Sequence, residues 1–320
     1  MKQADLGLNL STKRTRKREF LDEMNRVVPW AALVALVTPH APAGRRGRPP
    51  FPVETMLRIH FMQQWFGLSD PAMEEALFDV PRYREFAGLD NGNVGLPDES
   101  TILRFRHLLE AHKLAGPMLA TVNDVLRDKG LMLRIGTVVD ATLMSAPSST
   151  KNDSGQRDPE MRQTKKGNQW YFGMKAHIGV DAHSGLVHTV KGTAANVNDV
   201  VKANGLLHGD ETNVFGDAGY QGAHKRPGAK DGVTWHVAMR PGKRKALDKS
   251  TKLGALTDEI ERLKASIRAK VEHPFRVIKR QFGFTKVRYR GLKKNTAQIT
   301  TLFALANLWM ARRELIGLAA

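Results

Sequence analysis

Cysteine is absent from all 320 residues of the sequence. Disulfide bonds and zinc sites built from thiolates are therefore both excluded. A membrane-spanning run is also absent, because the most apolar stretch, residues 27–37, is well short of the roughly 20 apolar residues that a span needs. A basic run at residues 13–18 makes this stretch resemble a secretory leader, but acidic residues separate the two, so we expect an amphipathic helix near residues 19–37. These absences predict a soluble, cytoplasmic protein.

Acidic residues are scarce relative to basic ones. The chain has 32 Asp and Glu against 50 Lys and Arg, which gives a formal net charge of +18. Such a balance favours a polyanionic partner and disfavours a self-contained metabolic enzyme. Between Arg240 and Lys294 there are 18 Lys and Arg against 5 Asp and Glu, so 13 of the 18 net charges lie in this stretch. A solvated charged face is the alternative, but such faces usually mix both signs. Nucleic acid is the favoured partner.

The composition divides the chain into four segments. Residues 1–40 form a basic arm and a first helix, and residues 41–52 are a basic linker rich in Pro and Gly. Residues 53–130 show helical periodicity, whereas residues 131–320 begin with short β-rich runs separated by Gly and Asp. This order predicts an all-helical N-terminal region, for DNA binding or for packing and dimerisation, followed by an α/β domain with a mixed sheet.

The last segment carries the pattern from which its elements are predicted. Strands are expected at residues 134–144, 172–192 (two strands with a turn at 181–185), 212–220 and 234–240, and helices at 196–208, 256–282 and 299–315. Pro274 lies inside the long helix, where it removes a backbone donor at a cost of about 3 kcal/mol. We expect a kink or bulge there.

Four arginines in the first half of the chain are candidate DNA contacts. Arg46 and Arg48 lie in the run RGRP, which resembles the core of minor-groove-binding AT-hooks. A flexible basic tether is the alternative. Arg104 and Arg106 are expected to face outward from a helix that begins near Asp98, as in a helix-turn-helix reader of DNA. A helix used for packing or dimerisation fits the same pattern.

Lys165 and Lys166 precede Trp170 and Tyr171, so cations and rings lie close together in the sequence. This combination can hold a DNA strand by charge and by stacking. The alternative places both rings in the core. A structural role is expected for three histidines without a partner acid at metal-ligand spacing: His177, His183 and His188.

Three carboxylates stand out by their position. Asp140 and Asp217 each end an apolar run that reads as a strand, and a carboxylate there is costly to desolvate unless a cation or donors meet it. Capping of the following turn is the alternative for each residue. Together with Glu272 on the later helix, they supply hard oxygen ligands suited to Mg²⁺. Two such ions can clamp an in-line displacement at a phosphodiester.

The helix around Glu272 places two cations near it. On a regular helix, Arg268, Glu272 and Lys279 fall within a wedge of about 40° and share one face. A metal-binding glutamate between two phosphate clamps would engage one DNA backbone. The competing interpretation is an ion pair between Arg268 and Glu272, worth about 0.2–0.5 kcal/mol.

At these residues the sequence resembles bacterial insertion-sequence transposases with a DDE triad, and it is most similar to the insertion-sequence-five (IS-five) family. In the second half of the chain the likeness rests on residues 138–144, 158–190, 214–222, 237–245, 267–295 and 302–315. In the first half it rests on residues 44–79 and 97–110. The resemblance therefore spans most of the chain.

This resemblance implies a ribonuclease-H-like catalytic domain, with Asp140 on its first strand, Asp217 after its fourth and Glu272 on a later helix. In the wider group the glutamate belongs to a signature of tyrosine, two residues, arginine, three residues, glutamate, six residues and lysine. Arg268, Glu272 and Lys279 match this signature, whereas Ala265 stands at the tyrosine position. By analogy Arg268 and Lys279 grip phosphates near the transposon end. Arg276 and Arg280, on the same segment, are further candidate DNA contacts.

The resemblance also implies an activity. Such enzymes bind the terminal inverted repeats of their element in double-stranded DNA, act as dimers or larger complexes, nick the ends with water and join the 3′ hydroxyls to target DNA. The implied cofactor is Mg²⁺ as two ions, for which Mn²⁺ is expected to substitute, and the implied location is the nucleoid. Two alternatives stay open, namely a metal-dependent nuclease without strand transfer and a non-catalytic DNA-binding regulator.

Overall fold

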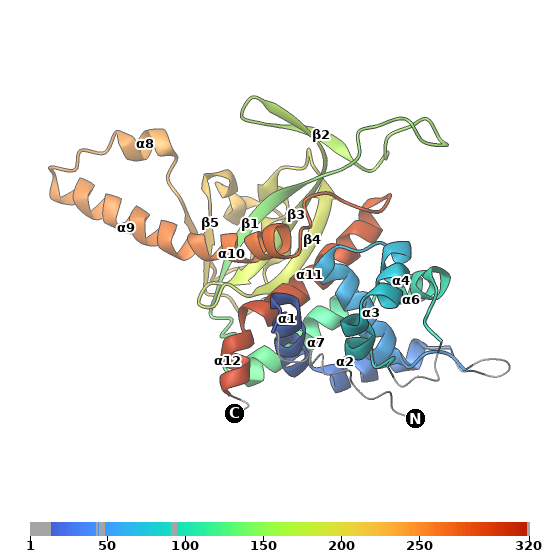
Figure 1. Cartoon of the computed structure of the whole chain (residues 1–320). Helices are drawn as coiled ribbons and strands as arrows, with labels where there is room; N and C mark the ends of the chain where they lie inside the picture. The colour runs from blue at the N-terminus through green and yellow to red at the C-terminus, as the bar shows by residue number, and fades with distance from the viewer. Residues whose placement is uncertain (1–13, 43, 45–48, 91–94, 319–320) are drawn as a thin grey trace.

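The computed structural model describes residues 14–42, 44, 49–90 and 95–318. A group of helices from the first part of the chain lies against a mixed β-sheet, and two features project from the sheet (Figure 1). One is a hairpin at the top of the view. The other is a helical arm at the left. None of the helices in these ranges combines the length and apolar character that crossing a bilayer requires.

The N-terminal region is all-helical, as expected. Its α-helices are α1 (Arg16–Val27), α2 (Trp30–Val37), α3 (Val53–Phe66), α4 (Asp70–Asp79), α5 (Pro81–Ala87), α6 (Glu99–Ala111) and α7 (Ala115–Asp128). The single helix expected near residues 19–37 is divided between α1 and α2 at Pro29, which cannot donate a helical hydrogen bond. Helix α3 is buried along most of its length and forms the centre of this region.

The sheet has the order β2-β3-β1-β5-β6, with β4 paired to β3. Its strands are β1 (Gly136–Ser145), β2 (Arg162–Lys166), β3 (Gln169–Asp181), β4 (Val187–Ala194), β5 (Asn213–Gly216) and β6 (Thr234–Val237). Strand β3 runs antiparallel to β1, β2 and β4, whereas β1, β5 and β6 are parallel. The expected mixed sheet is confirmed, although β2 was not anticipated, so Asp217 follows the fifth strand.

The prediction of a helix at residues 196–208 is wrong. The chain forms two short 3₁₀ turns there, η3 (Asp199–Val201) and η4 (Ala203–Leu206). Asn204 donates through Nδ2 to the carbonyl oxygens of Ala223, Arg226 and Pro227, and Gly205 follows it. An asparagine bound to distant carbonyls next to a glycine disfavours a continuous helix.

The long helix expected at residues 256–282 is present but interrupted. It is preceded by α8 (Pro241–Lys245), and its parts are α9 (Lys252–Arg268), the 3₁₀ turn η7 (Ala269–Val271), α10 (Glu272–Arg276) and the π-helix η8 (Val277–Gln281). The irregularity expected around Pro274 is therefore confirmed. Phe282 donates its N–H to the carbonyl of Val277, the five-residue spacing of a π-helix.

Helix α11 (Leu292–Met310), followed by α12 (Arg312–Gly317), joins the two regions. It begins earlier than the expected residue 299 and contacts both α7 and β4. Asn307 on α11 clasps Val187 of β4, because Oδ1 accepts the Val187 N–H at 2.8 Å and Nδ2 donates to its carbonyl at 2.7 Å. One hydrophobic core extends from Leu21 to Leu315, so the helical region and the sheet are packed into one unit.

Candidate active site

Asp140 and Asp217 lie on neighbouring parallel strands. Val138 of β1 pairs with Phe215 of β5, and continuing this register by two residues places Asp140 beside Asp217. Asp217 follows the last residue of β5, as expected. Asp140 does not end its strand, because β1 remains paired to β3 as far as Ser145. It lies where β5 stops and the edge of β1 becomes open.

Each aspartate has one hydrogen bond from the backbone. The Oδ1 atom of Asp140 accepts the N–H of Ala141 at 2.7 Å, and the Oδ1 atom of Asp217 accepts the N–H of Gly219 at 2.8 Å. The second bond caps the 3₁₀ turn η5 (Ala218–Tyr220), so the capping role considered for Asp217 is real. Since one oxygen does the capping, the other is left to bind a cation.

Glu272 is exposed at the start of α10. Neither its side chain nor that of Arg268 makes a hydrogen bond or ion pair with any residue that the structure describes. The alternative interpretation of an Arg268–Glu272 ion pair is therefore wrong for this conformation. The prediction that Arg268, Glu272 and Lys279 share one face of a regular helix is wrong as well, because a 3₁₀ turn lies between Arg268 and Glu272, and Lys279 lies within a π-helix.

Lys279 nevertheless reaches the site by another route. Its Nζ donates to Thr142 Oγ1 at 2.6 Å and to the carbonyl of Leu143 at 3.2 Å, both on β1 just beyond Asp140. Burial lowers the pKa of Lys279, the positive charge of Lys166 lowers it further, and the negative charge of Glu272 opposes both. Lys279 therefore lies close enough to Lys166 and Glu272 for their charges to act on it.

The pKa of Asp140 also indicates that Asp217 and Glu272 lie near it. Burial raises the pKa of Asp140 to about 7, with further increases from the negative charges of Asp217 and Glu272. The Ala141 N–H and the positive charge of Arg268 oppose the rise. Ionising a carboxylate in this setting costs free energy unless a cation compensates its charge. These oxygens fit the hard donor set of a divalent metal ion.

Tyr220 is a site residue that the sequence did not reveal. It is fully buried, and its hydroxyl has no hydrogen-bond partner among the described residues. Burial raises the pKa of Tyr220, and the negative charge of Asp140 raises it further, so the ring lies near the acids. A Cβ on Gly216 would lie 3.0 Å from the Tyr220 Cβ, which explains the glycine before Asp217. The available signal was an aromatic residue three positions after Asp217.

The hairpin of β2 and β3 carries Lys165, Lys166 and Trp170, all exposed. The Trp170 side chain has 64 % of its surface exposed, so the core alternative is wrong for this ring. Tyr171 is half-buried and donates its hydroxyl to Gln169 Oε1 at 2.8 Å. The exposed lysines and ring thus project from the sheet, and Lys166 lies close enough to Lys279 for its charge to lower the pKa of that lysine.

Other expected DNA contacts lie elsewhere. Arg104 is exposed on α6. Arg276 and Arg280 line a cavity of about 650 Å³ together with Trp309, and none of the three acids lines it. Arg46 and Arg48 lie outside the described residues.

The outward orientation expected for Arg106 is wrong. Its side chain is buried, and it forms ion pairs with Asp70 at 3.0 Å and Glu110 at 2.9 Å. The guanidinium also stacks over the ring of Tyr289 at 4.4 Å. A guanidinium neutralised and enclosed in this way has no face left for a phosphate, so Arg106 holds α6 to its neighbours.

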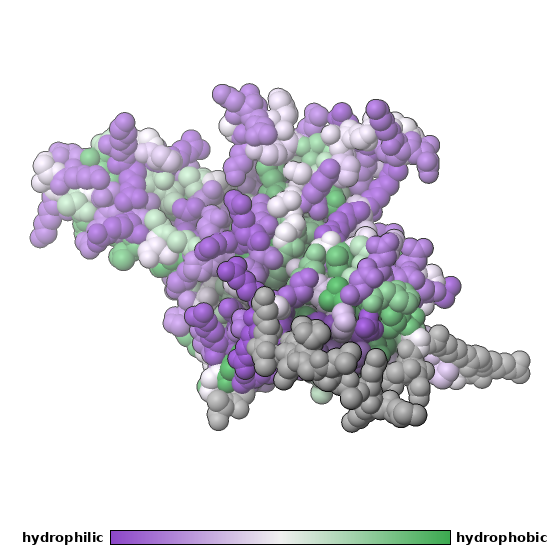
Figure 2. Space-filling view, in the orientation of Figure 1, coloured by the Kyte–Doolittle hydropathy of each residue, from purple (hydrophilic) through white to green (hydrophobic). Residues whose placement is uncertain are grey.

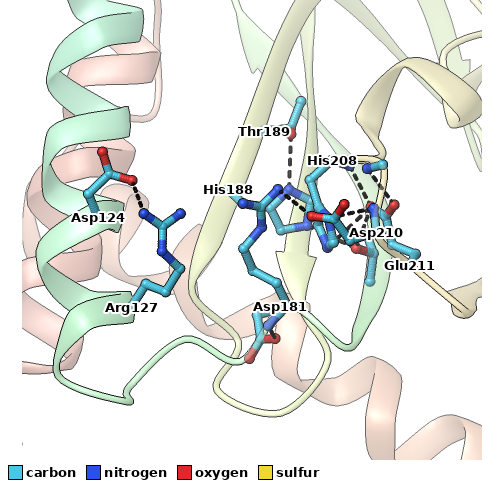
Figure 3. Close-up of polar contacts among 11 residues, drawn as sticks. Asp124, Arg127, Asp181, His188, Thr189, His208, Asp210 and Glu211 are labelled. Carbon is cyan, nitrogen blue, oxygen red and sulfur yellow. Dashed lines mark hydrogen bonds and ion pairs between the residues drawn. The ribbon is translucent and has the colours of Figure 1, made fainter.

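A second polar cluster contains His188, His208 and Glu211 (Figure 3) and contacts Thr137 near the start of β1. One ligand atom from each of His188, His208 and Glu211 lies within 4.8 Å of the others, and among the described residues Asp140, Asp217 and Glu272 do not form such a group. Both ring nitrogens of His188 lie within hydrogen-bonding distance of hydroxyls, at 3.0 Å for Thr137 and 2.9 Å for Thr189. Burial lowers the pKa of His188 to about 3, so the ring is neutral. Hydrogen bonding accounts for this cluster, which agrees with the structural role expected for His188.

Two family models match the chain. Residues 132–308 match the model of the transposase DDE domain, and residues 8–108 match the transposase domain DUF772. No solved structure matches the chain. The DDE model covers more than half of the sequence and contains all three acids, and the mixed sheet behind a helical region agrees with a ribonuclease-H-like domain. The chain therefore belongs to the DDE transposase family and is a metal-dependent enzyme that acts on DNA.

Proposed function

We propose that this transposase belongs to the IS-five group and uses Asp140, Asp217 and Glu272 to hold two Mg²⁺ ions, for which Mn²⁺ substitutes. The single observation that carries the proposal is the pairing of β1 with β5, whose register puts Asp140 beside Asp217. The negative charges of Asp217 and Glu272 both act to raise the pKa of Asp140. A half-buried acid next to other acids is stabilised in its ionised form by a cation. Divalent ions held by Asp140, Asp217 and Glu272 would activate the attacking oxygen and stabilise the leaving oxygen.

The reaction consists of two displacements at phosphorus. In the first, water attacks the phosphodiester at the element end, the 3′ oxygen leaves and takes up a proton, and a 3′ hydroxyl results. In the second, this hydroxyl attacks a phosphodiester of the target, a new phosphodiester forms and a target 3′ oxygen leaves. Arg268 has no protein partner among the described residues and is free to bind a phosphate.

Lys279 acts as a positioned cation in this scheme. Its bonds to Thr142 and Leu143 hold the ammonium beside the strand that carries Asp140. One N–H of the ammonium remains for a phosphate oxygen, because the group has three donors. A cation fixed before the substrate arrives loses little conformational entropy on binding.

The DNA path that we propose extends from the acids over the β2–β3 hairpin, where Lys165, Lys166 and Trp170 offer charge and a stacking face. The terminal inverted repeats would contact the helical region as well, including Arg104. Transposition joins two element ends, so we propose a dimer or larger assembly. Because the substrate is chromosomal DNA, we place the enzyme at the nucleoid in the cytoplasm.

The deciding experiment uses purified protein, a duplex that carries the element's terminal repeat, a target plasmid and Mg²⁺. Asp140→Asn, Asp217→Asn and Glu272→Gln should each abolish end cleavage and strand transfer while leaving binding of the duplex largely intact. Strand transfer at the wild-type level by any of these variants would contradict the proposed site. Cleavage without joined product in the wild type would indicate a nuclease, and binding without cleavage would indicate a regulator.

A further inference from the structure

Helix α9 exposes a row of large apolar side chains to solvent. The exposed fractions are 75 % for Leu253, 53 % for Leu256, 45 % for Ile260 and 57 % for Leu263. The helix forms one side of the arm that projects from the sheet (Figure 1), and green hydrophobic residues lie among the purple ones on that arm (Figure 2). Contiguous exposed apolar residues of this kind mark an interaction surface.

The spacing of the four residues is that of a coiled coil. Successive separations of three, four and three residues place Leu253 and Ile260 at one core position of a heptad, and Leu256 and Leu263 at the other. Ile267 continues the series and packs against the protein's own core. The stripe therefore leads from the body of the protein out along the free part of the arm.

The opposite face of α9 is already occupied, so the stripe cannot turn inward. Asp258 forms ion pairs with Arg244 at 2.7 Å and Lys249 at 3.1 Å. Glu261 is buried, accepts the N–H of Met239 at 2.8 Å and pairs with Lys264 at 2.7 Å. These contacts tie the helix to residues 239–249, which include α8, and fix the rotation that leaves the apolar side chains outside.

The charges beside the stripe identify the partner that fits it. Glu259 flanks one side of the stripe and Lys264 flanks the other, five residues later. The Lys264 ammonium already donates to Glu261 and to the Val237 carbonyl, which leaves the third of its three donors for a partner. In a parallel pair of identical helices this separation brings the glutamate of one chain next to the lysine of the other. In an antiparallel pair, like flanks face each other, which is unfavourable. DNA does not fit a row of leucines, and all four side chains of the stripe are exposed in the described structure.

We propose that α9 pairs in parallel and in register with α9 of a second copy of this chain. This inference names the contact for the dimer or larger assembly given under the proposed function. It rests on that function only for the role of the contact, which is to hold two active sites together. The helix is about 26 Å long, and four side chains per copy cover less than the roughly 800 Å² per partner of a stable interface. Pairing is therefore expected to be reversible and to strengthen when DNA holds two copies close together.

The absence of cysteine from the chain makes a direct test possible. Leu256→Cys introduces a single thiol at a core position, where the two Cα atoms of a parallel, in-register pair lie within disulfide reach. Ala255→Cys is the matched control, because its neighbouring position is also exposed but points away from the stripe. Both variants are oxidised at equal concentration, alone and with a 30-base-pair mixed-sequence duplex.

The expected result is a covalent dimer of Leu256→Cys, at least tenfold more abundant than that of Ala255→Cys, and more abundant with the duplex than without it. Equal linking of the two variants under both conditions would overturn the proposal. As a second measurement, the double variant Leu256→Lys/Ile260→Lys should sediment with a lower average mass than the wild type and keep its thermal unfolding midpoint. An unchanged mass distribution would also count against the pairing.

The test remains separate from the catalytic proposal. Leu256→Cys combined with Asp140→Asn should form the covalent dimer as well as Leu256→Cys alone, because no chemistry at DNA is needed. Loss of strand transfer with intact linking would therefore concern the acids, and loss of linking with intact cleavage would concern α9.

Discussion

Lys279 Nζ donates to Thr142 Oγ1 at 2.6 Å, so a π-helical residue near the C-terminal end of the chain is fixed to the strand that carries Asp140. The bond crosses 137 residues of sequence. It brings the segment of Glu272 back to β1 although the helix between them is irregular. The geometry of the acids therefore depends on this lysine as well as on the sheet.

Lys279→Ala should lower the rate of end cleavage by about 10²-fold, the usual effect of losing one fixed donor to a transition state. The measurement is single-turnover cleavage of a terminal-repeat duplex. Arg280→Ala is the control, because Arg280 is exposed and lines the cavity beside Trp309. It should cleave within a few-fold of the wild type, and equal losses in both variants would argue against a positioned cation.

The raised pKa of Asp140 predicts a pH-dependent stability in the absence of divalent metal. Its folded pKa of about 7 exceeds the ordinary value of 3.8, so the carboxyl contributes stability at low pH that is lost as the pH rises through about 7. Asp140→Asn removes this titration. In EDTA, its free energy of unfolding should gain on the wild type by about 3 kcal/mol between pH 5 and pH 9.

The same pair of proteins tests the metal site without any DNA. At pH 8, Mg²⁺ should raise the thermal unfolding midpoint of the wild type, because it compensates the acids, and should raise that of Asp140→Asn much less. Glu272→Gln serves as an intermediate case, since Glu272 is exposed and adds little desolvation. Identical metal-induced shifts in the wild type and Asp140→Asn would place the ion elsewhere.

Much of this architecture could be predicted from the sequence, because it rests on local patterns. The apolar run up to Asp140 and the run before Asp217 read as strands, and Pro274 marked the irregular turn. Strand β2 was missed because its RQTKK sequence has no apolar alternation and both of its faces are mostly exposed. A strand held only by its partner leaves no hydrophobic pattern to detect.

The errors at individual residues have a different cause. Arg106 was expected to face outward from its polarity, but its partner Asp70 lies 36 residues away, which spacing cannot reveal. Tyr220 was missed because its position near Asp140 depends on the packing of a 3₁₀ turn against Gly216. Both cases depend on tertiary contacts, whereas strand ends and helix breaks are written locally.

Arg106→Met should destabilise the protein by about 3–5 kcal/mol, because it leaves Asp70 and Glu110 without their buried partner. The free energy of unfolding in urea measures this effect. Arg104→Ala is the matched control on the same helix, exposed and two residues away. It should cost less than about 0.5 kcal/mol and should weaken DNA binding instead. A stable Arg106→Met protein with reduced DNA affinity would restore the outward orientation.

Trp170→Ala should weaken DNA binding without loss of stability. The ring is 64 % exposed on the β2–β3 hairpin, so its removal leaves no cavity, whereas stacking of a base on an aromatic ring contributes about 1–3 kcal/mol. Binding of a terminal-repeat duplex with a single-stranded end should therefore weaken by roughly 5-fold to 150-fold. Leu318→Ala, at an apolar side chain 58 % exposed after α12, should leave that affinity unchanged. Trp170→Phe should retain most of the affinity, because a smaller ring still stacks, whereas equal losses for Ala and Phe would indicate that the indole N–H makes the contact.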